Sequence, residues 1–223
     1  MRYVALFIML LGIGIQSSCT TTTLYIAPAQ ERNRHANRAY ATVIIRSDDG
    51  NATGVCITPT HILSCAHVIG ERDTIEIEYH SGERVEAKVV HTNTEDDLAL
   101  LSTPGRIHPF YARTIGELPA NGTEVYTVGH PRPVRFGYSA GTLMRATNSE
   151  MLISTYSNKG ASGSGVWHED RLIGILYGSS FFAGTTIREG SLCTPSSAII
   201  RFLEHAQKNG MVSPTAFDAL LSK

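Results

Sequence analysis

Three short segments of the sequence carry side chains that could perform nucleophilic catalysis. His67 closely follows the apolar run Ile62–Leu63, Asp97 directly precedes Leu98–Leu101, and Ser162 lies in a glycine-rich stretch. A serine hydroxyl is a poor nucleophile at neutral pH, so a neighbouring imidazole must remove its proton. A carboxylate can orient that imidazole and stabilise its charged form. Each segment alone is weak evidence, because such residues are more often structural, but together they predict acyl-transfer chemistry.

Two further residues compete for these roles. Asp96 stands beside Asp97, and Ser164 follows Ser162 by two positions in the same loop. Residue type and spacing alone leave both alternatives open.

The chain order His, Asp, Ser and the flanking residues resemble the chymotrypsin-like serine proteases. Ser64–Val68 is similar to that family's Thr-Ala-Ala-His block, Asp97–Leu101 to its Asp-Leu-Ala-Leu-Leu block, and Gly160–Ser164 to Gly-Asp-Ser-Gly-Gly. Subtilisins and α/β-hydrolases arrange the same residue types in other orders. The resemblance extends from about residue 40 to about residue 205, and it is greatest to the bacterial branch that includes the HtrA and glutamyl-endopeptidase types.

The resemblance implies a catalytic role for each matching residue. His67 would act as general base and acid, Asp97 rather than Asp96 would orient it, and Ser162 rather than Ser164 would be the nucleophile. The amides of Gly160 and Ser162 would form the oxyanion hole.

The resemblance also indicates where a peptide substrate would bind. It would pair with the strand containing Tyr177, Gly178 and Ser179, and the primary specificity pocket would lie between this strand and residues 155–159. The sequence does not indicate which side chain the pocket prefers. We expect a serine endopeptidase; the alternatives are a catalytically silent binding protein on a protease scaffold and an esterase that uses the same triad.

Short β-type runs separated by turn residues continue from residue 40 to residue 195. Residues 74–79 alternate between apolar and charged side chains, which is typical of a half-buried strand. One helical pattern covers Ser197–Gln207, with Ser196 or Ser197 as its N-cap, and residues 214–221 could add a short helix. The pattern indicates an all-β protein.

Combined with the resemblance, this pattern implies two six-stranded antiparallel β-barrels of the chymotrypsin type with a C-terminal helix. We expect the following divisions: a first barrel over residues 39–105, an inter-barrel linker over 106–118, a second barrel over 119–195, and the helix and tail over 196–223. The chain ends soon after the helix, so no PDZ domain is expected.

The N-terminal residues 1–18 resemble a signal peptide. The apolar run Val4–Ile15 follows Arg2 and is shorter than the roughly 20 residues that span a membrane. Ser17-Ser18-Cys19 resembles a bacterial lipobox, although Gln16 stands where leucine is usual. Lipidation of Cys19 and plain secretion both stay open, so we expect export as a cell-envelope lipoprotein or as a secreted or periplasmic protein. Residues 19–38 are predicted to be a flexible tether.

Composition narrows the range of partners. The net charge is −1 and the basic residues are scattered, which argues against a nucleic-acid partner and against membrane contact other than through a lipid. We expect a protein or peptide substrate and no cofactor; the oligomeric state is not readable. The chain has four cysteines and no cluster with zinc-ligand spacing, so no metal site is expected. A Cys56–Cys65 disulfide stays open, with buried thiols favoured.

Overall fold

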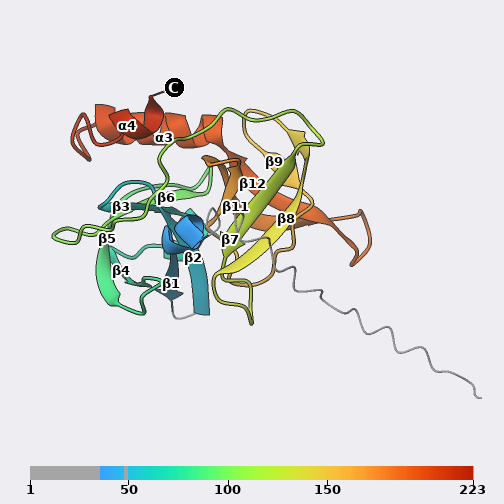
Figure 1. Cartoon of the computed structure of the whole chain (residues 1–223), viewed down its shortest axis with the longest axis horizontal. Helices are drawn as coiled ribbons and strands as arrows, with labels where there is room; N and C mark the ends of the chain where they lie inside the picture. The colour runs from blue at the N-terminus through green and yellow to red at the C-terminus, as the bar shows by residue number, and fades with distance from the viewer. Residues whose placement is uncertain (1–35, 48–49, 223) are drawn as a thin grey trace, which may run out of the picture.

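The structure, a computed structural model, describes residues 36–47 and 50–222. Its strands form two closed six-stranded barrels that lie side by side (Figure 1). The first barrel contains β1 (Thr42–Ser47), β2 (Gly50–Cys56), β3 (His61–Ser64), β4 (Thr74–Glu78), β5 (Arg84–Asn93) and β6 (Leu98–Ser102). The second contains β7 (Glu124–Gly129), β8 (Gly137–Ala146), β9 (Met151–Ile153), β10 (Ser164–His168), β11 (Arg171–Phe181) and β12 (Arg188–Pro195). The predicted fold class is confirmed.

Alternating apolar residues explain most of these strands. In β4, Ile75 and Ile77 point into the first barrel while Glu76 is exposed, as the period-two pattern predicts. Glu78 departs from the pattern, because only 3% of its surface is exposed. A buried carboxylate is costly unless it is paired, and Glu78 is paired with arginines, as described below.

One apolar core joins the two barrels and the C-terminal helix. It contains the interior of the first barrel together with Trp167 and Ile175 of the second barrel and Phe202 of helix α3 (Ser196–Lys208). A second, smaller core fills the second barrel alone. Helix α3 lies along one end of the molecule with the short helix α4 (Asp218–Leu221) (Figure 1). This shared core fixes the two barrels against each other.

The predicted cap of α3 is wrong. The N-cap position belongs to Pro195, which makes no side-chain cap. Ser196 is buried, and the Ser197 hydroxyl donates to the carbonyl of Asn148 at 3.1 Å. The helix therefore begins directly where β12 ends, and it is stabilised by its buried face rather than by a cap. The extra helix is shorter than the predicted 214–221.

The last residues of the predicted tether are anchored. Residues 36–40 form a helical turn, and Arg38 is 5% exposed. Its guanidinium lies 4.3 Å from the ring centroid of Tyr126 and 2.6 Å from Asp170. The prediction that residues 19–38 form a flexible tether is therefore wrong for residues 36–38. The signal peptide and Cys19 lie outside the described residues; within them, no helix has the length and apolar character needed to span a membrane.

Candidate active site

Asp97 holds His67 by two hydrogen bonds. His67 lies in the single helical turn α2 (Ala66–Ile69), immediately after β3. Its ring Nδ1 is 2.6 Å from Asp97 Oδ2, and its backbone N–H donates to Asp97 Oδ1 at 2.9 Å. Asp96 faces another way, with its carboxylate near Asn93 and 3.7 Å from Arg201. The geometry therefore pairs the histidine with Asp97 and not with Asp96.

The loop before β10 requires glycine at two positions. Gly160 and Gly163 have φ values of +95° and +88°, which side chains rarely adopt. A Cβ atom on Gly160 would lie 2.4 Å from the carbonyl oxygen of His130, and one on Gly163 would lie 1.8 Å from that of Thr53. Both glycines therefore allow a close approach of backbone that places Ser162 between them.

Thr53, a buried residue of β2, fastens this loop to the first barrel. Its hydroxyl donates to the Gly160 carbonyl at 2.8 Å and accepts from the His130 amide at 3.0 Å. Its own amide donates to the Ser162 carbonyl at 2.8 Å. The Ser64 hydroxyl in turn donates to the Thr53 carbonyl at 2.8 Å. This role was missed from the sequence, because nothing in the residues around Thr53 indicates a contact with a loop 107 positions further along the chain.

The two candidate serines differ in accessibility. Ser164 is 1% exposed and begins β10, whereas Ser162 is partly exposed. The Ser162 hydroxyl donates to the Tyr177 carbonyl at 3.4 Å, a long bond that is readily broken. Among the described residues, no hydrogen bond uses the amides of Gly160 or Ser162, so both are free to bind a ligand oxygen.

Residue Leu176 connects the histidine segment with the serine loop. Its carbonyl accepts from the Gly163 amide at 2.7 Å and from the Cys65 thiol at 3.4 Å. Cys65 precedes His67 by two residues, and Gly163 directly follows Ser162. The histidine, its carboxylate and the accessible serine are thus brought to one place, where the barrels meet.

One edge of β11 is open beside Ser162. β10 pairs with β11 only as far as Leu176, while β12 continues along the other edge from Gly178 to Phe181. No described strand covers the first edge beyond Leu176. Such an edge can accept an extended peptide as an additional strand. Tyr177, Gly178 and Ser179 all lie in this part of β11.

A thiol lies behind the histidine–carboxylate pair. One ligand atom each from Cys65, His67 and Asp97 lies within 4.8 Å of the others. Burial, followed by the charge of Asp97, raises the pKa of the Cys65 thiol well above 9.0, so the thiol stays protonated. Because metal ions bind the thiolate and Asp97 already occupies the His67 Nδ1, we assign no metal here. Cys56, Cys65 and Cys193 are all free and buried, so the disulfide alternative is wrong.

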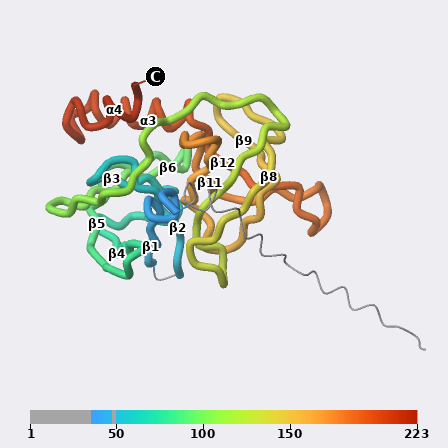
Figure 2. Tube along the Cα trace, viewed as in Figure 1, coloured from blue at the N-terminus to red at the C-terminus, as the bar shows by residue number. Residues whose placement is uncertain are grey.

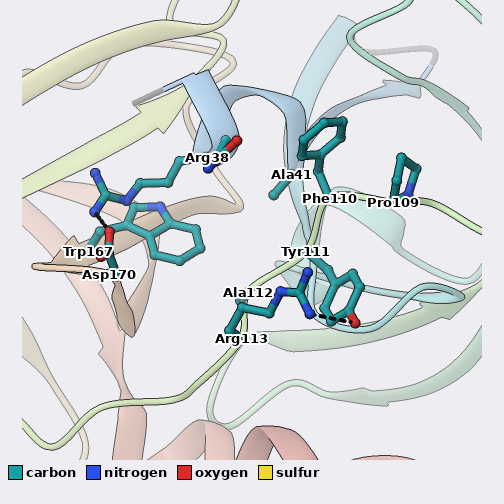
Figure 3. A pocket seen from close by; sticks show the side chains of 10 residues that line it. Arg38, Ala41, Pro109, Phe110, Tyr111, Ala112, Arg113, Trp167 and Asp170 are labelled. Carbon is teal, nitrogen blue, oxygen red and sulfur yellow. Dashed lines mark hydrogen bonds and ion pairs between the residues drawn. The ribbon is translucent and has the colours of Figure 1, made fainter. Parts of the chain in front are cut away.

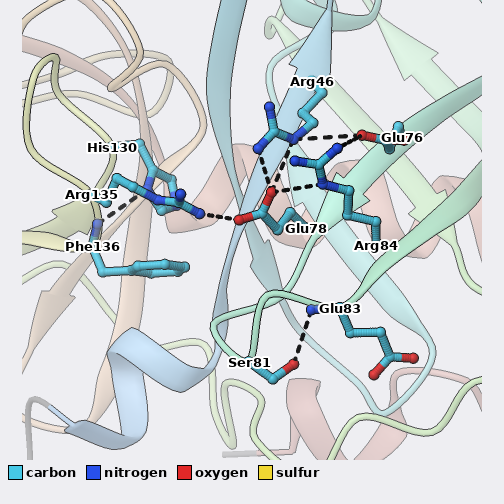
Figure 4. Close-up of polar contacts among 9 residues, drawn as sticks. All are labelled: Arg46, Glu76, Glu78, Ser81, Glu83, Arg84, His130, Arg135 and Phe136. Atoms are coloured by element: carbon cyan, nitrogen blue, oxygen red, sulfur yellow. Dashed lines mark hydrogen bonds and ion pairs between the residues drawn. The ribbon is translucent and has the colours of Figure 1, made fainter.

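A second contact between the barrels borders the serine loop. Glu78 of β4 binds Arg46, Arg84 and, across the barrels, Arg135 (Figure 4). Burial would raise the pKa of Glu78, but the hydrogen bonds from these arginines outweigh it and lower the pKa to about 2. Arg135 follows residues 130–132, which contact the serine loop through an Arg132 amide bond to the Lys159 carbonyl at 2.9 Å. Burial lowers the pKa of His130 in this segment to about 3, so it stays neutral.

A cavity of about 500 Å³ lies away from these residues. Figure 3 shows its lining side chains, among them Arg38, Tyr111, Arg113, Trp167 and Asp170. Arg38 and Asp170 pair with each other across one side of it, and burial lowers the pKa of Arg38. None of the residues that line this cavity belongs to the serine loop or to the open edge of β11, so it is not part of the site.

The trypsin-like peptidase domain family matches residues 52–175, which is more than half of the chain. The chain therefore belongs to this family of peptidases, and the resemblance to chymotrypsin-like proteases is confirmed. No curated protein sequence matches the chain.

Solved structures similar to this chain agree with the two-barrel fold. An inactive form of Rv3671c from M. tuberculosis H37Rv has a TM-score of 0.70 and 20% identity, covering 84% of this chain and 97% of that one. A serine endoprotease from Yersinia pestis has a TM-score of 0.70 and 21% identity, and the match covers 82% of this chain and 69% of that one. The HtrA-type protease AlgW with a tripeptide has a TM-score of 0.69 and 19% identity, and the match covers 81% of this chain and 64% of that one. At these identities the likeness shows the fold.

Proposed function

We propose that this peptidase is a serine endopeptidase in which His67, Asp97 and Ser162 form the catalytic triad. The observation that carries the proposal is the pair of hydrogen bonds from His67 to Asp97 beside an accessible serine. Asp97 holds Nδ1 in its protonated form, which leaves Nε2 as the base. The Ser162 hydroxyl leaves the Tyr177 carbonyl by rotation about Cα–Cβ and transfers its proton to Nε2 as its oxygen attacks the substrate carbonyl.

The backbone amides of Gly160 and Ser162 supply the oxyanion hole in this proposal. Both are without a partner in the described residues, and the loop that carries them is fixed by Thr53. Fixed donors aimed at the developing charge need no rearrangement during the reaction, and loss of one such donor typically costs about 10²–10³ in rate. The protonated His67 then gives its proton to the leaving amine, and water releases the acyl group by the same steps.

The substrate is proposed to bind as an extended peptide along Tyr177, Gly178 and Ser179. The open edge of β11 supports this, because backbone hydrogen bonds to it would place a peptide carbonyl beside Ser162. A protein or peptide is therefore the expected substrate class.

Covalent labelling tests the triad. The full chain would be treated with a fluorophosphonate at neutral pH beside Ser162→Ala and Ser164→Ala. We expect the label on the wild type and on Ser164→Ala, and none on Ser162→Ala. Loss of label only in Ser164→Ala would overturn the assignment of the nucleophile. Absence of label from the folded wild type would favour a catalytically silent protein. A labelled wild type that hydrolyses esters but cleaves no peptide would favour an esterase.

We also propose that the protein is exported, on the evidence of the signal-peptide pattern in residues 1–18. Production of the full chain in a bacterial host, followed by intact-mass measurement, tests it. A new N-terminus near Cys19 with a lipid mass supports a cell-envelope lipoprotein, and the same N-terminus without lipid supports secretion. An uncleaved chain in the cytoplasm contradicts export.

A further inference from the structure

Three serine hydroxyls and one guanidinium meet beside the proposed nucleophile. The Ser157 hydroxyl lies 2.8 Å from that of Ser191 and 3.1 Å from that of Ser179. Arg188 Nη1 donates to the Ser157 hydroxyl at 3.1 Å and also to the Ser157 carbonyl. Ser157 and Ser191 are 2% and 0% exposed. We call Ser157, Ser179, Ser191 and Arg188 the hydroxyl–arginine cluster.

The cluster lies where a substrate side chain would enter. Ser157 precedes Ser162 by five residues in the same loop. Ser179 follows Tyr177, whose carbonyl accepts the Ser162 hydroxyl, by two residues on the open edge of β11. A peptide paired with this edge and presenting its carbonyl to Ser162 would have a neighbouring side chain within reach of the cluster.

A β-bulge turns Arg188 toward the serines. In the β11–β12 hairpin, which extends away from the barrel (orange, Figure 2), Ser179 pairs with Ser191 and Phe181 pairs with Arg188. The register shifts between Ser180 and Phe181, so Glu189 is an extra residue. Cross-strand partners share a face, as do residues two apart in a strand, so Arg188 lies on the face of Ser179 and Ser191. Without the bulge it would lie on the opposite face.

The charge of Arg188 is not neutralised within the part of the chain that the structure describes. Among the described residues no carboxylate pairs with it. The nearest in sequence, Glu189, accepts the Ser180 hydroxyl at 2.8 Å on the other face. Two aromatic rings, those of Tyr156 and Phe181, have their centroids 5.7 and 6.0 Å from the guanidinium, and both side chains are more than half exposed. The guanidinium is therefore held in place and keeps donors to spare.

Proton counting leaves the serines able to donate as well. The Ser191 hydroxyl lies 2.8 Å from the Thr155 carbonyl, which can only accept, so its single proton is used there. Ser157 accepts from Arg188, and its own proton can go to the Ser179 hydroxyl at 3.1 Å. The Ser179 hydroxyl is left with its proton for an outside acceptor. A cation and a hydroxyl donor that face the same space suit a carboxylate.

We propose that the hydroxyl–arginine cluster binds an acidic side chain, Asp or Glu, of the substrate residue that donates the scissile carbonyl. Arg188 is the specificity-determining residue, and Ser179 donates a second hydrogen bond. This inference rests on the proposed function, since it takes cleavage to occur at Ser162.

Matched peptide pairs test the inference in the full chain. The pairs differ only in Glu against Gln at the residue before the cleaved bond. We expect wild type to favour Glu by about 10- to 100-fold in kcat/KM, the size of a charged hydrogen bond. Arg188→Gln should bring this ratio to about one, and Arg188→Lys should retain part of the preference. Arg113→Gln is the control, because Arg113 also lies over a tyrosine ring, at 4.5 Å, but away from the site.

Two results would overturn the inference. One is a wild-type enzyme that cleaves the Gln and Glu peptides with equal kcat/KM. The other is an Arg188→Gln variant that lowers both rates equally and so keeps the ratio, which would show that Arg188 only supports the loop through the Ser157 carbonyl.

Binding measured without turnover separates this inference from the proposed function. Calorimetry on Ser162→Ala should show tighter binding of Glu peptides than of Gln peptides, and the difference should vanish in Ser162→Ala/Arg188→Gln. If wild type cleaves no peptide while this difference persists, the proposed function fails and acid recognition stands. If wild type cleaves peptides and the difference is absent, acid recognition fails and the peptidase mechanism stands.

Discussion

The hydroxyl of Thr53 in the first barrel donates a 2.8 Å hydrogen bond to the carbonyl of Gly160 in the second barrel. Gly160 precedes the proposed nucleophile by two residues and carries one of the two proposed oxyanion amides. A peptide plane is rigid, so holding the Gly160 carbonyl fixes the plane that this carbonyl shares with the Ala161 amide, and that plane lies between the two proposed oxyanion amides of Gly160 and Ser162. The first barrel therefore shapes the serine loop in addition to supplying the histidine and the carboxylate.

The variant Thr53→Val should separate the role of Thr53 in shaping the serine loop from its contribution to the stability of the fold. The variant keeps the shape of the side chain but leaves the Gly160 carbonyl and the His130 amide without their partner. We expect unfolding free energy to fall by about 1–3 kcal/mol and kcat to fall by about 10²-fold. Thr42→Val is the matched control, since Thr42 is equally buried and its hydroxyl donates to the Arg38 carbonyl at 2.7 Å, away from the site. Equal loss of kcat in both variants, measured beside urea unfolding, would contradict the role.

Asp97→Asn should lower kcat by about 10⁴-fold, because an amide can hold His67 in the wrong tautomer. The backbone should tolerate the change, since Asp97 has φ +51° and asparagine adopts this region readily. Asp96→Asn, beside it, should leave kcat within about threefold. Steady-state kinetics on a cleaved peptide, with circular dichroism to verify folding, measures both. If Asp96→Asn were the more damaging variant, the carboxylate assignment would be wrong.

Gly163→Ala should disrupt the loop that carries Ser162. The added methyl group would lie 1.8 Å from the Thr53 carbonyl oxygen, in a backbone conformation with φ +88°. Strain and overlap together should cost about 3–5 kcal/mol of unfolding free energy. Gly184→Ala provides the comparison, because Gly184 has φ +71° with open space around it, so only about 1–2 kcal/mol is expected. Thermal unfolding of both variants measures the difference; equal losses would show that the close contact is relieved without cost.

Glu78 should make stability fall in acid. Its pKa is lowered from 4.5 to about 2, so the folded state binds its proton less readily than the unfolded state. The stabilisation is fully present above about pH 4.5 and is lost as pH falls toward 2; it amounts to about 3 kcal/mol. Urea unfolding at several pH values should show this loss in wild type and not in Glu78→Gln. The unfolding free energy of that variant should already be lower at pH 7.

Glu83→Gln controls for surface charge in that experiment. The Glu83 side chain is 44% exposed, and within residues 36–47 and 50–222 its one ion pair is with Arg106, so the change should alter the unfolding free energy by less than about 1 kcal/mol. A wild-type profile that is flat between pH 5 and pH 2 would contradict the role of Glu78.

Local patterns in the sequence predict the strands, and the resemblance of three short motifs to a known family implies the two barrels and the proposed catalytic residues. Strand alternation and turn residues can be read within ten positions, and the motifs around His67, Asp97 and Ser162 are each confined to a few residues. The structure places these motifs together through contacts that the sequence does not display. Leu176, which joins the histidine segment to the serine loop, acts through its carbonyl, and every residue has one.

Other features depend on exceptions to local rules. Glu78 occupies a position that alternation assigns to solvent, and only arginines from three separate segments make its burial tolerable. Arg188 would lie on the wrong face by simple alternation, and the bulge at Glu189 reverses it. Neither exception can be derived from the residues themselves. This is why the sequence left the proposed specificity pocket open, whereas it indicated the proposed catalytic residues.

The Thr53–Gly160 contact also bears on when activity can arise during folding. The amide and carbonyl of Gly160 belong to the half of the chain that is synthesised last, whereas Thr53, His67 and Asp97 belong to the half synthesised first. Neither half alone holds all the residues of the proposed site, and the core shared by the two barrels must close before the loop is fixed. In the proposed mechanism, hydrolytic competence therefore requires that both halves of the chain have folded and closed against each other.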